Sequence, residues 1–218
     1  MLMLNLASTM QTQLKMLARG DRSNFTDHLQ VPHVELNGKT LGVIGAGKIA
    51  RQVIRIAQAM DMNVLCHARK PRENEENLTF VPLEQLLRES DFITIHCPLT
   101  PQTRHLIDEQ ALAVMKPTAF LINTARGEIV EQKQLVRFLK TGKLFAAGLD
   151  VFPNNSEVEP ELLDMPNVVL TPHIGSNTNE TRKEMSERIV SIVKAVCDDE
   201  AVLKGNLVNA ESLKARKS

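Results

Sequence analysis

The chain has 218 residues, of which 26 are Lys or Arg and 26 are Asp or Glu, so its formal net charge is zero. A neutral chain lacks the field that attracts nucleic acids and anionic membranes, so neither partner is expected. Its three cysteines, Cys66, Cys97 and Cys197, are odd in number and far apart. This pattern excludes a disulfide scaffold and predicts a reducing, cytoplasmic location. No window of about 18 apolar residues predicts a membrane-spanning helix.

The first residues predict an amphipathic helix. Apolar side chains recur there every three or four residues, at Met3, Leu6, Met10, Leu14 and Leu17. Such a stripe fits a helix that packs on its own domain, and it equally fits an arm that contacts a second copy of the chain. We assign residues 1–30 to an N-terminal helical arm, 31–200 to one domain and 201–218 to a polar tail.

After the arm, short apolar strands alternate with amphipathic helices. Strands are predicted at 40–44, 63–67, 91–97, 119–124, 144–151 and 168–171. Helices are predicted after the first strand, from Pro82, around 112–115, around 135–139 and from 178 to about 197. The alternation implies parallel strands joined by right-handed crossovers. The predicted fold is therefore α/β, a doubly wound parallel sheet with helices on both faces, with acidic loops at 71–77 and 153–166.

A glycine-rich turn follows the first strand. The segment Gly45-Ala-Gly-Lys-Ile-Ala50 fits the pattern G-x-G-x-x-A between a strand and a helix, which is the setting of a dinucleotide-binding fingerprint. Gly45 permits a tight turn, Gly47 permits close approach of a pyrophosphate, and Ala50 lets the helix pack on the sheet. The helix start at Lys48 and Ile49 offers free N–H groups to phosphate. The alternative is a turn that uses glycine for its shape alone.

The residues at the end of the second strand indicate which cofactor is preferred. NAD-selective sites usually place an acidic residue there to bind both ribose hydroxyls, but this chain has Ala68 followed by Arg69. An arginine fork can bind a 2′-phosphate that a carboxylate would repel. The sequence therefore favours NADP, with NAD possible, and the alternative is a solvated basic loop.

Five motifs occur in a familiar order, namely the glycine turn, His96–Thr100, Asn123–Gly127, Gly148–Phe152 and Thr171–Gly175. In these motifs the chain resembles the NAD(P)-binding domain of D-isomer-specific 2-hydroxyacid dehydrogenases, in particular glyoxylate/hydroxypyruvate reductases and phosphoglycerate dehydrogenase. The stretch Ala68–Arg72 looks most like the NADPH-using glyoxylate/hydroxypyruvate branch. The resemblance implies a Rossmann-like fold, a homodimer, and an oxidoreductase acting on CH–OH donors. The reaction implied is hydride transfer between nicotinamide and a small 2-keto or 2-hydroxy acid such as glyoxylate or hydroxypyruvate.

The resemblance also implies roles for individual residues. Arg126 would bind the substrate carboxylate and polarise its carbonyl, and His173 would exchange the proton of the carbonyl oxygen. The alternatives are a surface cation and a packed loop histidine. His96, at a strand end, is predicted to be structural, and no metal is expected. The other residues expected at the cofactor cleft are Cys97, Pro98, Thr103, Thr124, Ala125, Asp150 and Gly175.

Two features depart from the family pattern. The slot of the glutamate that pairs with the catalytic histidine holds Asn155, and Glu157 or Glu159 are the possible substitutes. The flavodoxin-like substrate domain of the family has no counterpart in this sequence. The alternative function is therefore a truncated, non-catalytic module for dinucleotide binding or dimerisation.

Overall fold

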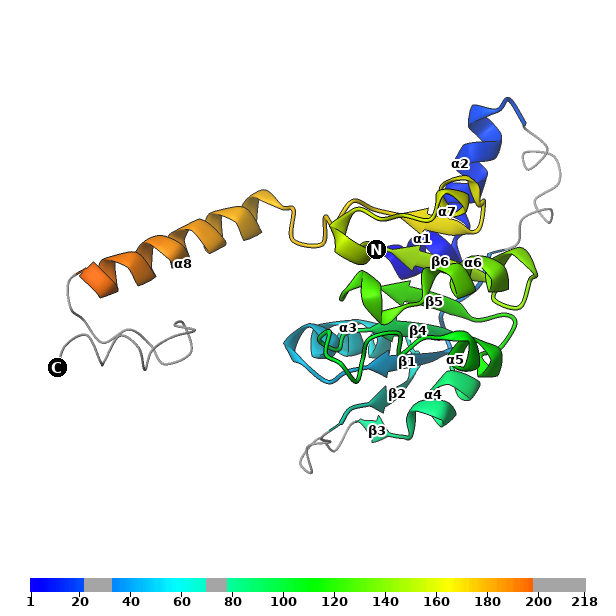
Figure 1. Ribbon diagram of the computed structural model, residues 1–218, viewed down its shortest axis with the longest axis horizontal. Helices are drawn as coiled ribbons and strands as arrows, with labels where there is room; N and C mark the ends of the chain where they lie inside the picture. The colour runs from blue at the N-terminus through cyan, green and yellow to red at the C-terminus, as the bar shows by residue number, and fades with distance from the viewer. Residues whose placement is uncertain (22–32, 70–77, 198–218) are drawn as a thin grey trace. The chain divides into compact units, whose positions relative to one another are not determined.

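A single parallel sheet organises the protein. The computed structural model describes residues 1–21, 33–69 and 78–197 (Figure 1). The sheet has seven strands in the order β3-β2-β1-β4-β5-β6-β7, all parallel, and Figure 1 shows them rising from β3 at the lower edge to β6. The strands are β1 (Thr40–Ile44), β2 (Asn63–His67), β3 (Thr79–Phe80), β4 (Phe92–Ile95), β5 (Phe120–Asn123), β6 (Ala146–Leu149) and β7 (Val168–Leu170). The predicted doubly wound parallel sheet is confirmed.

The strand order reverses beside β1. The chain passes from β1 to β2 and β3 on one side and then returns to β4 on the other side. In open α/β sheets, ligands bind at the carboxyl ends of the strands where the order reverses, so the gap between β1 and β4 is the expected site. The helices are α1 (Leu2–Ala7), α2 (Met10–Ala18), α3 (Lys48–Gln58), α4 (Leu83–Glu89), α5 (Glu109–Val114), α6 (Gln132–Lys140), α7 (Pro160–Asp164) and α8 (Asn179–Cys197), with short 3-10 turns η2 (Gly127–Ile129) and η3 (Pro153–Asn155).

Successive side chains of a strand point to opposite faces, and each face of this sheet has its own core. Leu41 and Val43 of β1 pack in the core that includes residues of α1 and α3, whereas Ile44 packs in the core that includes residues of α4, α5 and α6. Phe92 and Phe120 stack across β4 and β5 with ring centroids 4.4 Å apart. Burial on both faces explains why the strands read as nearly continuous apolar runs.

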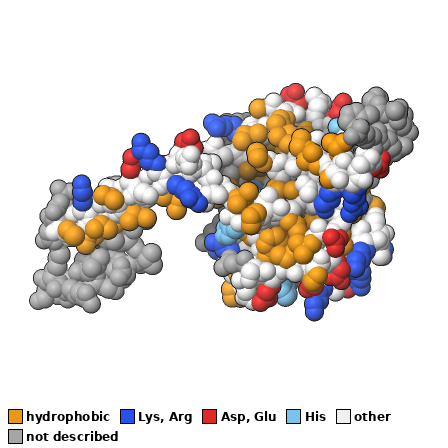
Figure 2. Space-filling model, turned by 90° about the horizontal axis from the view of Figure 1, so that it is seen from above, with side chains coloured by type: hydrophobic (Ala, Val, Ile, Leu, Met, Phe, Trp, Pro, Cys, Tyr) orange, Lys and Arg blue, Asp and Glu red, His pale blue; other side chains and the backbone are white. Residues whose placement is uncertain are grey.

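The N-terminal segment forms two helices rather than the single helix predicted. Thr9 adopts a left-handed conformation, with φ of 49°, and separates α1 from α2. In α1, Leu6 is buried against β6, where Gly148 leaves room for its side chain. In α2, the apolar side chains of Met10, Leu14 and Leu17 remain exposed. Figure 2 shows that hydrophobic side chains gather in patches on the surface seen from above. The predicted apolar stripe is therefore divided between a part in α1 that packs on the sheet and a part in α2 that is exposed.

The chain divides into two compact units, residues 1–173 and 174–218. The first contains α1, α2 and the whole sheet, and the second contains α8, in which no residue is buried. Exposed apolar side chains of α8 are Met185, Ile189, Val190, Val193 and Val196. The polar tail predicted for 201–218 lies outside the described residues, and the predicted domain boundaries stay predictions. No helix in the described ranges is long and apolar enough to cross a membrane.

Candidate functional site: a crevice at the carboxyl ends of the strands

A pocket of about 430 Å³ opens where the loops after β4 and β5 meet the start of α3. Its position matches the reversal of strand order, where open sheets bind ligands. Residues predicted from the sequence make up most of its wall, and His96 and Leu99 complete it. The lining residues are Ile49, His96, Cys97, Pro98, Leu99, Thr124, Ala125 and Arg126.

The glycine turn has the shape that dinucleotide binding requires. Gly45 has φ of 106°, and a Cβ atom there would lie 2.8 Å from the backbone carbon and oxygen of His96, so only glycine fits. A Cβ on Gly47 would meet no atom within 4 Å, which leaves open space at the helix start. Ala50, in the first turn of α3, is fully buried. With no acidic side chain in the first turn of α3, its N–H groups and dipole are suited to a pyrophosphate.

The end of β2 lies beside this turn. His67 pairs with Ile44 in the sheet, and its carbonyl oxygen accepts the N–H of Gly45 at 2.7 Å. Ala68 is half-buried and the side chain of Arg69 is exposed, so the residues expected to contact the adenosine ribose lie beside the glycine turn. Residues 70–77, which hold the other two cations of the predicted basic loop, lie outside the described residues.

The loop that carries Arg126 is shaped by a residue that we did not single out from the sequence. The side chain of Asn123 is buried at the end of β5, accepts the N–H of Ala125 at 3.0 Å and donates to the carbonyl oxygen of Arg126 at 2.8 Å. In the sequence, the only indication of this residue's role is an amide side chain at the end of an apolar strand. The exposed Arg126 guanidinium donates from Nη1 to the carbonyl oxygen of Ala125 at 2.6 Å, on the wall of the pocket.

The loop after β4 is held by a predicted cleft residue. The hydroxyl of Thr103 accepts the N–H of Thr100 at 2.8 Å and donates to the carbonyl oxygen of Pro98 at 2.7 Å. Thr103 thus stabilises the loop, while Cys97 and Pro98 line the pocket. Burial raises the pKa of the Cys97 thiol, so it stays protonated and acts as a lining group rather than a thiolate nucleophile.

His173 and Asp150 lie past the carboxyl ends of β7 and β6. Asp150 is buried and its Oδ1 accepts the hydroxyl of Thr171 at 2.6 Å, which ties the two strand ends together. His173 is exposed and has φ of 53°, and its N–H donates to the carbonyl oxygen of Thr171. Gly175 belongs to the second unit, so its predicted place in the cleft stays a prediction.

The acidic partner of His173 is not supplied by either predicted substitute. The carboxylate of Glu157 accepts the side-chain amide of Asn154 at 2.8 Å, and the backbone of Glu159 bonds to the Gln132 side chain at 3.4 Å. His173, Glu157 and Glu159 are all described, and no ion pair or hydrogen bond joins the histidine to either glutamate. The side chain of Asn155 lies outside the described residues.

His96, predicted from the sequence to be structural, is part of the pocket wall. Its Nε2 lies 3.0 Å from Oγ1 of Thr94, and burial lowers the pKa of its imidazole from 6.5 to about 4. The ring is therefore neutral at physiological pH. Among the described residues, no three or more His, Cys, Asp or Glu side chains lie together in a way that could bind a metal.

The low pKa of His96 makes stability depend on pH. As pH falls below 6.5, an unfolded chain takes up the proton before the folded one does, so unfolding becomes more favourable. Between about pH 7 and about pH 5 this residue should lower the free energy of unfolding by about 2 kcal/mol. The measurement is urea denaturation at both pH values, and the His96→Asn variant should lack this part of the decrease. An equal decrease in wild type and variant would contradict the prediction.

Comparison with known proteins decides the family. Residues 1–175 match the family described as "D-isomer specific 2-hydroxyacid dehydrogenase, NAD binding domain". The chain belongs to this family. It is 42% identical over 186 residues to a glyoxylate reductase of Pyrococcus furiosus and 44% identical over 186 residues to that of Pyrococcus horikoshii, covering 84% of this chain and 55% of each relative. The chain thus spans about half the length of these relatives.

Solved structures agree with this family. A glyoxylate reductase from Paecilomyes thermophila superposes with a TM-score of 0.81 and 36% identity, covering 97% of this chain and 63% of that one. A D-lactate dehydrogenase from Aquifex aeolicus, complexed with NAD and lactic acid, superposes with a TM-score of 0.79 and 32% identity, covering 91% and 64%. The crevice described above therefore belongs to an NAD-binding domain of the dehydrogenase fold, and its glycine turn, open helix start and apolar wall fit a nicotinamide dinucleotide.

Proposed function

We propose that the protein is an oxidoreductase that transfers hydride between a nicotinamide dinucleotide and a small 2-keto or 2-hydroxy acid such as glyoxylate or hydroxypyruvate. The observation that carries the proposal is an arginine, Arg126, on the wall of a pocket that also contains the start of α3. A pocket for the dinucleotide alone needs no guanidinium facing it. Similarity to proteins named glyoxylate reductase supports a two-carbon keto acid as substrate.

Each side chain has a distinct task in this proposal. The bound nicotinamide supplies the hydride for reduction. The planar guanidinium of Arg126 binds the substrate carboxylate through paired hydrogen bonds and stays charged at any working pH. The imidazole of His173 gives a proton to the carbonyl oxygen during reduction and takes it back during oxidation. Ile49 and Leu99 contribute apolar wall that excludes water from the reacting atoms.

The test is turnover by the purified chain. NADPH and glyoxylate are added, oxidation of the nicotinamide is followed by absorbance, and nucleotide affinity is measured separately by fluorescence titration. We expect nucleotide binding together with glyoxylate-dependent oxidation. Tight nucleotide binding without turnover would instead favour the alternative of a non-catalytic dinucleotide-binding module. Absence of nucleotide binding would contradict both.

We propose further that the cofactor is NADP in preference to NAD. Arg69 directly follows Ala68 at the end of β2, beside the glycine turn, where NAD-selective sites carry a carboxylate. Arg69→Ala should weaken NADPH binding by about 10- to 100-fold, because a charge-assisted hydrogen bond is lost, and should leave NADH binding unchanged. The control is Arg55→Ala, an exposed arginine at the last turn of α3. Tighter binding of NADH than of NADPH by the wild type would contradict the preference.

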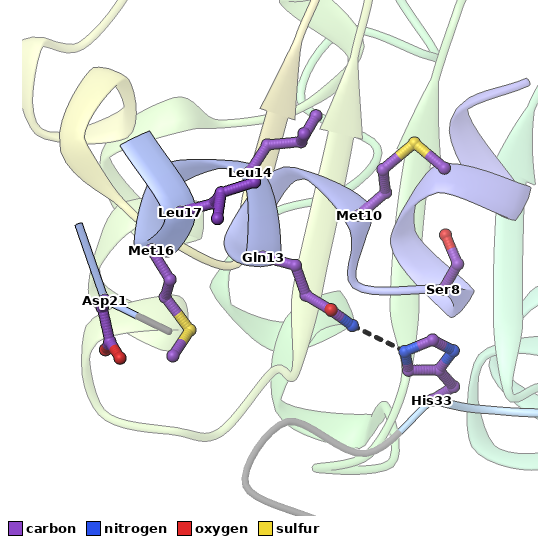
Figure 3. Close-up of a pocket in the computed structure, with 8 residues that line it drawn as sticks. All are labelled: Ser8, Met10, Gln13, Leu14, Met16, Leu17, Asp21 and His33. Carbon is purple, nitrogen blue, oxygen red and sulfur yellow. Dashed lines mark hydrogen bonds between the residues drawn. The ribbon is translucent and has the colours of Figure 1, made fainter. Parts of the chain in front are cut away.

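We propose that two copies associate through α2. Its exposed apolar side chains border a groove of about 300 Å³ (Figure 3), where Gln13 and His33 are joined by a side-chain hydrogen bond of 2.6 Å. Exposed apolar patches of this kind commonly mark protein interfaces. The lining residues are Ser8, Met10, Gln13, Leu14, Met16, Leu17, Asp21 and His33.

Sedimentation at micromolar concentration measures the association. The wild type should sediment as a dimer and the Leu14→Glu variant as a monomer, because a charge would be buried unpaired at the interface. Ile56→Glu, at an exposed apolar position of α3, is the matched control and should remain dimeric. A monomeric wild type would refute the association.

We also propose a cytoplasmic location for the protein. None of the three described cysteines, Cys66, Cys97 and Cys197, is in a disulfide, and thiols stay reduced in a reducing compartment. Fractionation of cells that express the protein would test the location, and recovery with an oxidising compartment would contradict it.

A further inference from the structure

The starting observation is a buried hydroxyl with one partner. Thr94 lies on β4 with 4% of its surface exposed, and its Oγ1 is 3.0 Å from Nε2 of His96. Within the described ranges, the structure records no other hydrogen bond for this hydroxyl. Buried O–H groups are almost always donors to some acceptor. The Thr94 hydroxyl therefore donates to Nε2, which must carry a lone pair rather than a proton.

This contact fixes the tautomer of His96. Because burial lowers the pKa of the ring to about 4, the imidazole is neutral and carries a single proton, which then resides on Nδ1. The structure records no partner for Nδ1 among the described residues. His96 is thus a neutral ring with one unused N–H donor, and it forms part of the wall of the 430 Å³ pocket.

The surroundings of the ring indicate what this donor would bind. The same pocket includes Ile49 in the first turn of α3, and a Cβ on neighbouring Gly47 would meet only open space. Free N–H groups at a helix start favour a phosphate, and the oxygens of an ionised phosphate only accept hydrogen bonds. The backbone of His96 passes so close to the glycine turn that a Cβ atom added at Gly45 would come within 2.8 Å of it, and the His96 side chain lines the same pocket as Ile49.

We infer that His96 donates its Nδ1–H to the pyrophosphate of the bound dinucleotide, with Thr94 as the positioning residue that sets the tautomer. The inference rests on the proposed dinucleotide function and adds a side-chain donor opposite the backbone donors of α3. A neutral donor leaves the charge of the site unchanged over the physiological range, unlike an imidazolium, so its contribution to affinity is independent of pH there.

Two isosteric variants separate the two ring nitrogens. The side-chain amide nitrogen of asparagine can occupy the place of Nδ1, whereas that of glutamine reaches only to the place of Nε2. Calorimetric titration with ADP-ribose, which contains the pyrophosphate but no nicotinamide, measures the contact. His96→Gln should weaken ADP-ribose binding by about 10-fold or more, while His96→Asn should stay within about 3-fold of the wild type. Binding of AMP, which has no pyrophosphate, should change little in either variant.

Nitrogen-15 NMR of the histidine ring reads the tautomer directly. The free wild-type protein should show the proton on Nδ1 of His96, and the Thr94→Val variant should lose this preference while Thr94→Ser keeps it. A proton on Nε2 in the wild type would overturn the inference. So would equal ADP-ribose affinities of wild type and His96→Gln, with the proposed function left intact. Failure of the wild type to bind ADP-ribose would overturn the proposed function and this inference together.

Discussion

Replacing His173 with alanine is expected to lower kcat for glyoxylate reduction by about 100- to 10,000-fold, the range over which a positioned acid–base group contributes. Without the imidazole, the carbonyl oxygen must take its proton from water as the hydride arrives. Affinity for NADPH should stay unchanged, because the glycine turn and the start of α3 are untouched. The measurement is steady-state NADPH oxidation combined with fluorescence titration of the nucleotide.

The chain offers a matched control for this variant. His105 is also exposed and also has φ of 53°, so His105→Ala makes the same chemical change on the same backbone conformation. It should retain turnover close to that of the wild type. Equal losses in the two variants, or a His173→Ala protein with full activity, would contradict the role of His173 as the proton donor.

Gly127→Ala is expected to destabilise the fold by about 3 kcal/mol or more, at the upper end of the cost of overpacking a buried site. A Cβ atom at Gly127 would collide with the backbone of Phe152 and Pro153. Backbone atoms cannot rotate away as a side chain does, so the loops after β5 and β6 would have to separate. Urea or thermal denaturation of wild type and variant measures the loss.

A second glycine provides the comparison. A Cβ at Gly47 meets nothing within 4 Å and its φ is −77°, so Gly47→Ala should cost less than about 1 kcal/mol, the size of a change at a helix N-cap. If both variants unfold at the same denaturant concentration as the wild type, the close approach of the two loops at Gly127 is wrong.

The fold could be predicted because its signal is repetitive. Every strand from β1 to β7 except β3 follows the alternation of apolar runs and helical stripes seen in the sequence. The strand β3 has two residues and the helix α7 has five, which is too short for either periodicity to appear. The break at Thr9 depends on a backbone conformation that residue type scarcely indicates.

Residue type indicated which residues gather at the crevice. The glycine turn has the tight geometry expected of it and Arg126 lines the pocket, while the binding and catalytic roles of these residues stay predictions. The side-chain contacts of Asn123 and His96 could not be predicted, although both are local, because residue type does not tell which nearby group a polar side chain will bond. Asn123 bonds to the backbone of the loop after β5, and His96 lies beside the Thr94 hydroxyl two residues earlier. Both residues are polar side chains at the carboxyl end of an apolar strand, a feature that the sequence alone displays.

The amide of Asn123 has a consequence for how the loop evolves and binds. It bonds to the backbone N–H of Ala125 and the backbone carbonyl of Arg126, so the loop is held by backbone atoms that every residue type except proline possesses. Its shape is fixed when the chain folds, and a ligand that arrives later need not order it, which removes an entropic cost from binding. Because the side chains at 125 and 126 take no part in these two bonds, changing them leaves both bonds in place. The end of β5 thus holds the loop backbone in place, while the side chain at position 126, which lines the pocket, can differ in chemistry.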